Sequence, residues 1–205
     1  LVFLAFNYYE SKAFTEFLLV QPMSRRSIFL GKYLALATSL SLGYIMGVLI
    51  PTIPIYIMGR ADIQGMIDLL ILLLSGVLLS FSFVAIAFSI AIIFDDKAKG
   101  FGFNMVVWLY LSLIHDGVIL LVSVVFSQYP LEKVILFLTL INPIDVSRIL
   151  IVLRLNIAAL MGYTGAVFQK FFGSAEGMVI SFGVMLLWII LPTIGGMYKF
   201  NRKDF

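Results

Sequence analysis

Long apolar stretches constrain the fold of this chain more than any other feature of its sequence. Three of them contain no Asp, Glu, Lys or Arg, namely residues 33–59, 69–94 and 178–198. A fourth stretch, residues 101–126, contains only Asp116 from this charged set. Each exceeds the roughly 20 apolar residues that a helix needs to cross a hydrocarbon core of about 30 Å. The sequence therefore predicts an all-α protein, a polytopic bundle of membrane helices.

Composition supports the same fold class and excludes several chemistries. The chain is 62% hydrophobic and 12% charged, whereas soluble domains carry about 25% charged residues. It has no Cys and one His, which excludes disulfides, thiol catalysis and a multi-histidine metal site within one copy. The basic residues lie beside the apolar stretches, so no nucleic-acid partner is predicted.

The distribution of basic residues predicts the orientation of the spans. Four, two and three Lys and Arg residues fall in the short segments 7–32, 95–100 and 199–205. The other five are spread over 60–68 and the much longer segment 127–177. Because cytoplasmic loops carry the excess of basic residues, we expect the first three segments in the cytoplasm and residues 127–177 on the outer side.

The chain starts within a short apolar run. Leu1–Phe6 cannot span a bilayer, and neither a Met nor a basic region precedes it, so a signal peptide is not predicted. We expect this run to be the tail of a helix whose beginning is missing. Residues 1–205 are then one transmembrane domain of an N-terminally truncated chain.

Small side chains predict where the spans pack. Two sets recur on one helix face each: Ser39, Gly43 and Gly47 in the first stretch, and Ser75, Ser82 and Ser89 in the second. Helices in lipid associate through such residues, so we expect helix packing at both sets; the alternative is the lining of a polar conduit. Pro51 and Pro54, at the outer end of the first stretch, are expected to end or bend its helix.

The third predicted span carries unusual polar groups. At helical spacing, Asn104, Ser112 and His115 share a stripe with Trp108, and Asp116 lies beside it. A charge at a helix centre costs about 2.5–3.5 kcal/mol on insertion scales, so these groups are expected to face the bundle interior, with Ser112 donating to Asp116. They serve either in interhelical hydrogen bonds or in a substrate path, proton relay or conformational switch. No second acidic residue lies inside a predicted span, so a complete proton path within one copy is not predicted.

The segment 7–32 predicts a short amphipathic helix at the inner membrane face. Its apolar stripe at helical spacing is formed by Ala13, Phe14, Phe17 and Leu18. Gln21-Pro22 is expected to end this helix, and Ser24 is expected to cap the next one. The helix is either an interfacial anchor or a docking surface for a cytoplasmic protein.

The outer segment 127–177 is too long for a turn and too apolar for a soluble loop. We expect two or three interfacial helices with breaks near Pro130, Asn142-Pro143 and Gly173. Asn142 is expected to cap a helix that starts at Pro143, with Asp145 in its first turn, where a negative charge suits the helix dipole. Ser174 is expected to cap the last span. The segment is either a lid that completes a dimer or a platform for a periplasmic partner.

No segment of the chain predicts nucleotide chemistry. A phosphate-binding loop of the form G-x-x-x-x-G-K-[ST] is absent, and Gly100-Phe-Gly102 lacks the strand and third Gly of a dinucleotide site. We therefore expect no catalytic residue, metal site or cofactor in this chain. ATP and Mg²⁺ are expected on a partner chain.

The cytoplasmic segment resembles a known family. The run Glu16-Phe-Leu-Leu-Val-Gln-Pro22-Met-Ser-Arg25-Arg26, followed by Gly31-Lys32, is similar to the first cytoplasmic loop of ABC-2 type transporter permeases. The resemblance implies a six-span protein, here without its first span, that forms a homodimer in the inner (cytoplasmic) membrane. It also implies a separate ABC ATPase subunit docked on a coupling helix. The residues expected at this ATPase contact are Glu16, Pro22, Arg25, Arg26 and Lys32.

Two further patches resemble a branch of that family. They are Trp108-Leu-Tyr-Leu-Ser-Leu-Ile-His115-Asp116 and Asn142-Pro143-Ile-Asp145-Val-Ser-Arg148. Both are similar to NosY-type permeases of the copper-processing system that matures nitrous-oxide reductase. This resemblance implies a periplasmic accessory protein. The residues expected to face it are Asn142, Pro143, Asp145 and Arg148.

The sequence thus predicts a permease subunit that couples ATP hydrolysis on another chain to transport, or to a periplasmic partner. Three alternatives stay open. The chain is an ABC-2 exporter of a drug, lipid or peptide, or an intramembrane enzyme that uses His115 and Asp116, or a scaffold that needs no ATPase. The proteins bound to it in gently solubilised membranes distinguish these alternatives.

Overall fold

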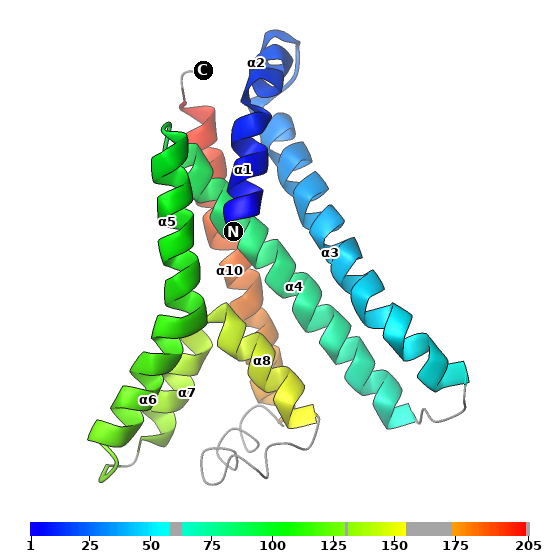
Figure 1. Ribbon diagram of the computed structural model, residues 1–205, viewed down its shortest axis with the longest axis vertical. Coiled ribbons are helices and arrows are strands. Elements are labelled where there is room, and N and C mark those ends of the chain that lie inside the picture. Colours follow the sequence, from blue (N-terminus) through cyan, green and yellow to red (C-terminus); the bar gives the residue numbers. More distant parts are fainter. Residues whose placement is uncertain (58–62, 130, 155–173, 204–205) are drawn as a thin grey trace.

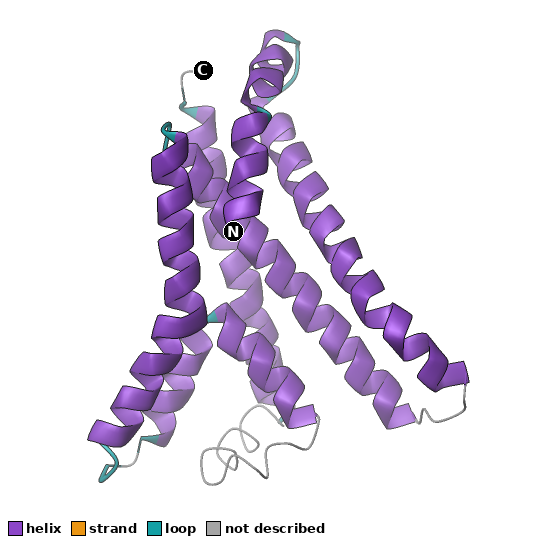
Figure 2. Ribbon diagram, viewed as in Figure 1, coloured by secondary structure: helices purple, strands orange, loops and turns teal. Residues whose placement is uncertain are grey.

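A computed structural model describes residues 1–57, 63–129, 131–154 and 174–203, and within them the protein is helical without any strand (Figures 1 and 2). The described helices are α1 (Val2–Glu10), α2 (Lys12–Val20), α3 (Arg25–Ile57), α4 (Ile63–Ile93), α5 (Lys97–Leu109), the π-helical turn η1 (Tyr110–Ile114), α6 (His115–Val125), α7 (Glu132–Ile141), α8 (Pro143–Arg154) and α10 (Ala175–Asn201).

The predicted spans are confirmed. Four helical segments of the described chain are long and apolar enough to cross a membrane: Arg25–Pro54, Ile63–Ile93, Lys97–Val125 and Glu176–Asn201. The third of them, which we call the third span, consists of α5, η1 and α6. A fifth candidate is the pair of α7 and α8, which are bent by 111° at their break. The chain is therefore a multi-pass membrane protein.

The arrangement of the helix ends agrees with the predicted orientation. In Figure 1, α2, the turn between α4 and α5, and the C-terminal end of α10 lie at one end of the bundle. These are the segments that hold most of the basic residues. The turn between α6 and α7 lies at the opposite end (Figure 1). We refer to these as the cytoplasmic and outer ends.

Helix α4 is the central element, and two of its serines bond to α10. The Ser82 hydroxyl donates to the Met185 carbonyl at 3.4 Å, and the Ser89 hydroxyl donates to the Pro192 carbonyl at 2.5 Å. The predicted helix packing is confirmed for Ser82 and Ser89, since small side chains let two backbones come close enough to bond. Ser75 is also fully buried, and its hydroxyl donates to the Leu72 carbonyl of its own helix.

Replacing Gly196 with Val is expected to destabilise the bundle. A Cβ atom at Gly196 would lie 2.6 Å from the Ser89 hydroxyl oxygen and 3.3 Å from the Ser89 Cα atom, so the backbones of α4 and α10 would have to separate. Overpacking of this kind costs about 1–3 kcal/mol, and thermal unfolding in detergent measures it. Gly195→Val is the matched control, because a Cβ atom there would have no neighbour within 4 Å among the residues that the structure describes. Equal effects of the two changes would contradict this packing.

Helix α3 differs from its prediction. A Cβ atom at Gly43 or Gly47 would have no neighbour within 4 Å among the described residues, so the GxxxG motif does not pack against the described helices. The reason is that α3 packs on α4 through a face that places Tyr44 against Gly76, and this leaves Gly43 and Gly47 exposed. Pro51 and Pro54 lie inside α3, which continues to Ile57, so they do not end it.

Tyrosines connect α3 to α4. The Tyr33 hydroxyl donates to the Phe81 carbonyl at 3.3 Å, and the Tyr44 hydroxyl donates to the Leu72 carbonyl at 2.9 Å. A groove of about 630 Å³ lies beside Tyr44, lined mostly by apolar and small side chains of α1, α3 and α4.

Candidate functional site

The helix predicted from the amphipathic stripe forms α2 at the cytoplasmic end. It stops at Val20, and Gln21 has an extended backbone before Pro22. Ser24 begins α3 as predicted, because its hydroxyl accepts a hydrogen bond from the Ser27 amide at 3.1 Å. The stripe faces outwards: Phe14 and Phe17 are 58% and 62% exposed. The opposite face of α2 turns a buried Thr15 towards α3.

Lys32 lies beneath α2 rather than on its exposed surface. Its ammonium donates to the Ser11 carbonyl at 3.1 Å, to the Ser11 hydroxyl at 2.9 Å and to the Thr15 hydroxyl. A half-buried ammonium with these three acceptors is satisfied inside the chain. Lys32 therefore connects α3 to α2, and the structure does not place it where a docked protein would touch it.

Arg25 is also occupied within the chain. Its guanidinium donates to the Asn201 carbonyl at 3.2 Å and to the Lys203 carbonyl at 2.7 Å. The Lys203 ammonium donates to the Ile92 carbonyl and to the Asp95 carboxylate, both at 2.7 Å. This hydrogen bond from Lys203 lowers the pKa of Asp95. We call Arg25, Asp95 and Lys203 the C-terminal clamp, since they join the start of α3, the α4–α5 turn and the end of α10.

Two of the predicted contact residues remain free at this end. Glu16 and Arg26 are exposed, and the described part of the chain offers neither of them a hydrogen bond or an ion pair. Pro22 is exposed as well. The structure thus divides the predicted set into Glu16, Pro22 and Arg26, which are accessible, and Arg25 and Lys32, which hold the helices together.

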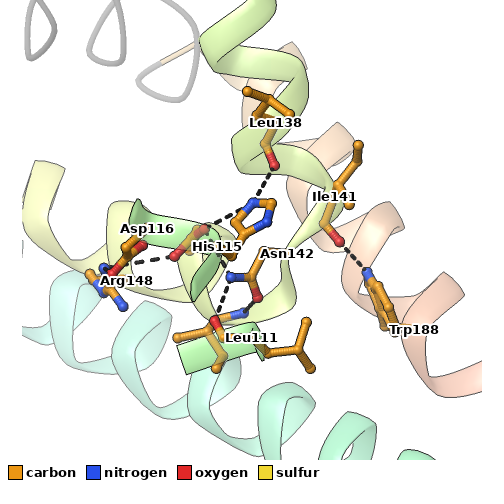
Figure 3. A network of polar contacts seen from close by, with 10 residues as sticks. Leu111, His115, Asp116, Leu138, Ile141, Asn142, Arg148 and Trp188 are labelled. Carbon is orange, nitrogen blue, oxygen red and sulfur yellow. Dashed lines mark hydrogen bonds and ion pairs between the residues drawn. The ribbon is translucent and has the colours of Figure 1, made fainter. Parts of the chain in front are cut away.

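A second polar cluster lies in the interior (Figure 3). Asn142, between α7 and α8, is fully buried. Its amide nitrogen donates to the Leu111 carbonyl at 2.7 Å and to the Asp145 carboxylate at 2.9 Å. Its amide oxygen accepts from the Ile144 amide at 3.1 Å, which confirms the predicted cap. One side chain thus caps α8 and ties it to the π-helical turn.

Charged groups surround this amide. His115 Nε2 lies 3.0 Å from the Leu138 carbonyl oxygen and 3.5 Å from the Asp145 carboxylate. The Arg148 guanidinium donates to the Asp116 carboxylate at 2.7 Å and lies 3.7 Å from Asp145. We call His115, Asp116, Asn142, Asp145 and Arg148 the interior cluster.

The expected hydrogen bond from Ser112 to Asp116 is wrong. The Ser112 hydroxyl donates to the Trp108 carbonyl at 2.7 Å. Ser112 lies in η1, and Asp116 follows this element in the chain. The i→i+5 hydrogen bonds of η1 widen the turn, so the side chains of Ser112 and Asp116 do not lie one above the other. Of the predicted stripe, Asn104 and His115 are buried, Asn104 donates to the Gly100 carbonyl, and Trp108 is exposed.

The α7–α8 pair turns at the level of the middle of the third span. The break at Asn142 bonds to Leu111, which is the central residue of Lys97–Val125. The pair therefore enters the bundle from the outer end and turns back at mid-depth (Figure 1), forming a re-entrant hairpin. Asn142 and Asp145 are consequently buried rather than outward-facing, because the protein interior supplies the partners that their polar groups need.

The remaining predictions for the outer segment have separate outcomes. Ser174 caps α10 as predicted, since its hydroxyl accepts from the Gly177 amide at 3.0 Å. The predicted breaks at Pro130 and Gly173 lie outside the described residues.

The interior cluster suits structural and electrostatic roles. Within the described residues no group of three or more His, Cys, Asp or Glu side chains could hold a metal ion. His115 Nε2 and Asp116 are both engaged with α7 and α8. The sequence analysis did not predict that His115 and Asp116 contact the segment from Asn142 to Arg148. The signal for this contact was the single acidic residue of the third predicted span, Asp116, together with a basic residue, Arg148, close to Asp145.

A comparison with models of protein families identifies a relationship over most of the chain. The model of the family described as ABC-2 family transporter protein matches residues 13–205, which include all of α2 after Lys12, the four spans and both polar clusters. No curated protein matches the chain.

Proposed function

The chain belongs to the ABC-2 transporter family, and from this premise we propose that α2 is the element through which an ATPase subunit drives the spans. Members of this family are the membrane components of transporters and work with ATPase subunits, and residues 1–205 contain no phosphate-binding loop. The proposal concerns the surface of this chain that binds the ATPase.

The exposed side of α2 carries the proposal. Phe14 and Phe17 present an apolar face at the cytoplasmic end, and Val20 continues it at 87% exposure. Glu16 and Arg26 flank this face with unpaired charges of opposite sign. An apolar centre with a charged rim is typical of a protein interface.

The hydrogen bonds beneath α2 supply a route for force. Lys32 connects α2 to α3, and Arg25 connects the first turn of α3 to the end of α10. A push on α2 would therefore act on α3 directly and on α10 through the C-terminal clamp. A side chain that makes two or more hydrogen bonds to a neighbouring helix couples the movements of the two helices directly.

Charge reversal tests the ATPase surface. We expect the pair Glu16→Lys and Arg26→Glu to abolish co-purification of the ATPase from mild detergent, because exposed rim charges steer association and exclude mismatched partners. Lys99→Glu is the matched control, since it reverses an exposed charge at the same end but on α5. Full retention of the ATPase by the double variant would remove α2 as its docking surface.

We further propose a NosY-like role in copper processing, with a periplasmic accessory partner at the outer end. The support is the likeness of the two patches to NosY-type permeases, together with their contact in one interior cluster. Copper is the cargo in this proposal and is not assigned a site in this chain. Recovery of a periplasmic accessory protein with the gently solubilised complex would support it, and recovery of an ATPase alone would favour the alternative.

The alternative function is that of an ABC-2 exporter of a drug, lipid or peptide. The open apolar groove of about 630 Å³ favours this alternative.

A homodimer is proposed from the exposure of the Arg148–Asp116 pair. These side chains are 47% and 40% exposed in one copy, at the depth of the middle of the third span. An ionic group facing hydrocarbon is costly, and such groups usually face protein or a water-filled cavity. A second copy, or water held between two copies, would cover this pair.

A further inference from the structure

Polar contacts from two spans hold the α7–α8 hairpin in the bundle (Figure 3). The third span contributes the Leu111 carbonyl, His115 and Asp116, which bond to Asn142, Leu138 and Arg148. Helix α10 contributes the Trp188 indole, which donates to the Ile141 carbonyl at 3.0 Å. The attachment of the hairpin thus depends on polar groups at its turning point.

Two atoms of this cluster lack a hydrogen-bond partner. His115 and Asp145 have side chains that are only 3% and 4% exposed, and His115 Nδ1 and Asp145 Oδ1 form no hydrogen bond with the described residues. The Leu138 carbonyl can only accept, so His115 Nε2 carries a proton. The two atoms without a partner, His115 Nδ1 and Asp145 Oδ1, can therefore accept one more proton.

The charges of the cluster also leave room for one proton. The Asp116 and Asp145 carboxylates share the single guanidinium of Arg148, which is hydrogen-bonded to Asp116 and 3.7 Å from Asp145. With a neutral imidazole the cluster carries a net charge of minus one, and one added proton brings it to zero. Burial of an uncompensated charge is unfavourable, which favours the neutral form.

Other titratable groups near the pair are few. The Tyr110 ring of η1 lies 6.0 Å from the His115 ring between centroids. The other charged residues of the packed helices lie near helix ends, namely Asp68 in α4, Lys97 and Lys99 in α5, Glu132 and Lys133 in α7, Arg154 in α8, and Glu176 and Lys199 in α10. The charge balance at the hairpin turn is therefore set within the interior cluster.

We propose that His115 and Asp145 form a proton-binding site in the interior of the bundle, and that its occupancy determines how firmly the α7–α8 hairpin is attached to the third span. With the proton bound, the cluster is neutral and Asn142 holds the hairpin turn against Leu111. Loss of the proton leaves a net negative charge between α6 and α8, which weakens the attachment. A rise in pH thus releases the hairpin, and acidification attaches it.

The test follows the distance between α6 and α7 as the pH changes. The chain has no Cys, so two can be introduced at Leu120 and Phe137, which are exposed. Both are spin-labelled in the full-length permease assembled with its ATPase in nanodiscs. We expect the interlabel distance to change in a single transition as the pH is raised.

Three variants decide the outcome. Asp145→Asn removes the buried charge, and Asp116→Asn releases Arg148 to neutralise Asp145, so each is expected to keep the low-pH distance at every pH. Glu132→Gln, which removes the acidic residue at the start of α7, away from the hairpin turn, should retain the full transition. If Asp145→Asn fails to assemble, Asp116→Asn decides alone. A pH-independent distance in the parent, or an unchanged transition in the assembled Asp-to-Asn variants, would overturn the proposal.

Discussion

Asn142→Leu is expected to lower the free energy of unfolding by about 2–4 kcal/mol, because it removes one partner from several buried groups at once. The Leu111 carbonyl, the Asp145 carboxylate and the Ile144 amide each lose a hydrogen bond. Leucine is close to asparagine in size, so the loss is one of polar partners rather than of volume. Denaturant unfolding in detergent micelles measures it.

Asn104→Leu is the matched control for this change. Asn104 is also fully buried, but its amide donates only to the Gly100 carbonyl of its own helix, and its oxygen has no partner in the described chain. Replacing such a group with an apolar one of similar shape is close to neutral. If the two variants lost equal stability, the interior cluster would not be what holds the hairpin.

Lys32→Met is expected to reduce transport-coupled ATP hydrolysis roughly tenfold while leaving the ATPase bound, since coupling free energies are about 1–3 kcal/mol. The methionine keeps the apolar stem but loses the ammonium that bonds to Ser11 and Thr15. The docking face of α2 stays unchanged, whereas its connection to α3 is lost. ATP hydrolysis by the reconstituted complex and co-purification of the ATPase are measured on the same preparation.

Lys12→Met is the control for the loss of charge. Lys12 lies on α2, the helix to which Lys32 bonds, and the described residues give the Lys12 ammonium no hydrogen bond. We expect hydrolysis near the parent level in this variant. Loss of ATPase binding in Lys32→Met, or equal effects of the two changes, would show that Lys32 acts at the docking surface.

The spans, and the gathering of the basic segments at one end of the bundle, could be predicted because both depend on local composition. An uncharged stretch such as 69–94 can only be accommodated in lipid or in a core, and basic residues such as Lys97 and Lys99 mark the cytoplasmic side. The hairpin could not be placed in this way. Each of α7 and α8 is too short to span a bilayer, and its depth depends on Asn142 meeting a carbonyl 31 residues away in the sequence.

The accessible residues of the site were predictable, but the roles of the bonded ones were not. Glu16 was expected at the ATPase contact from the family resemblance of its motif, and it is exposed. Arg25 and Lys32 belong to the same motif, yet their partners are Lys203 and Ser11. Whether a long basic side chain turns outwards or caps a neighbouring helix end depends on which carbonyls tertiary packing brings near, and helical periodicity does not contain that information.

The C-terminal clamp bears on how the protein is made. Lys203 follows every described span in chain order, so its contacts with Asp95 and Ile92 form only after α10 has left the ribosome and entered the membrane. Before that, Arg25 and Asp95 lack the partners that the end of α10 supplies, whereas the hydrogen bonds among the earlier helices can already form. An unfinished chain therefore presents an uncompensated arginine and aspartate at this end of the bundle, and the finished chain does not.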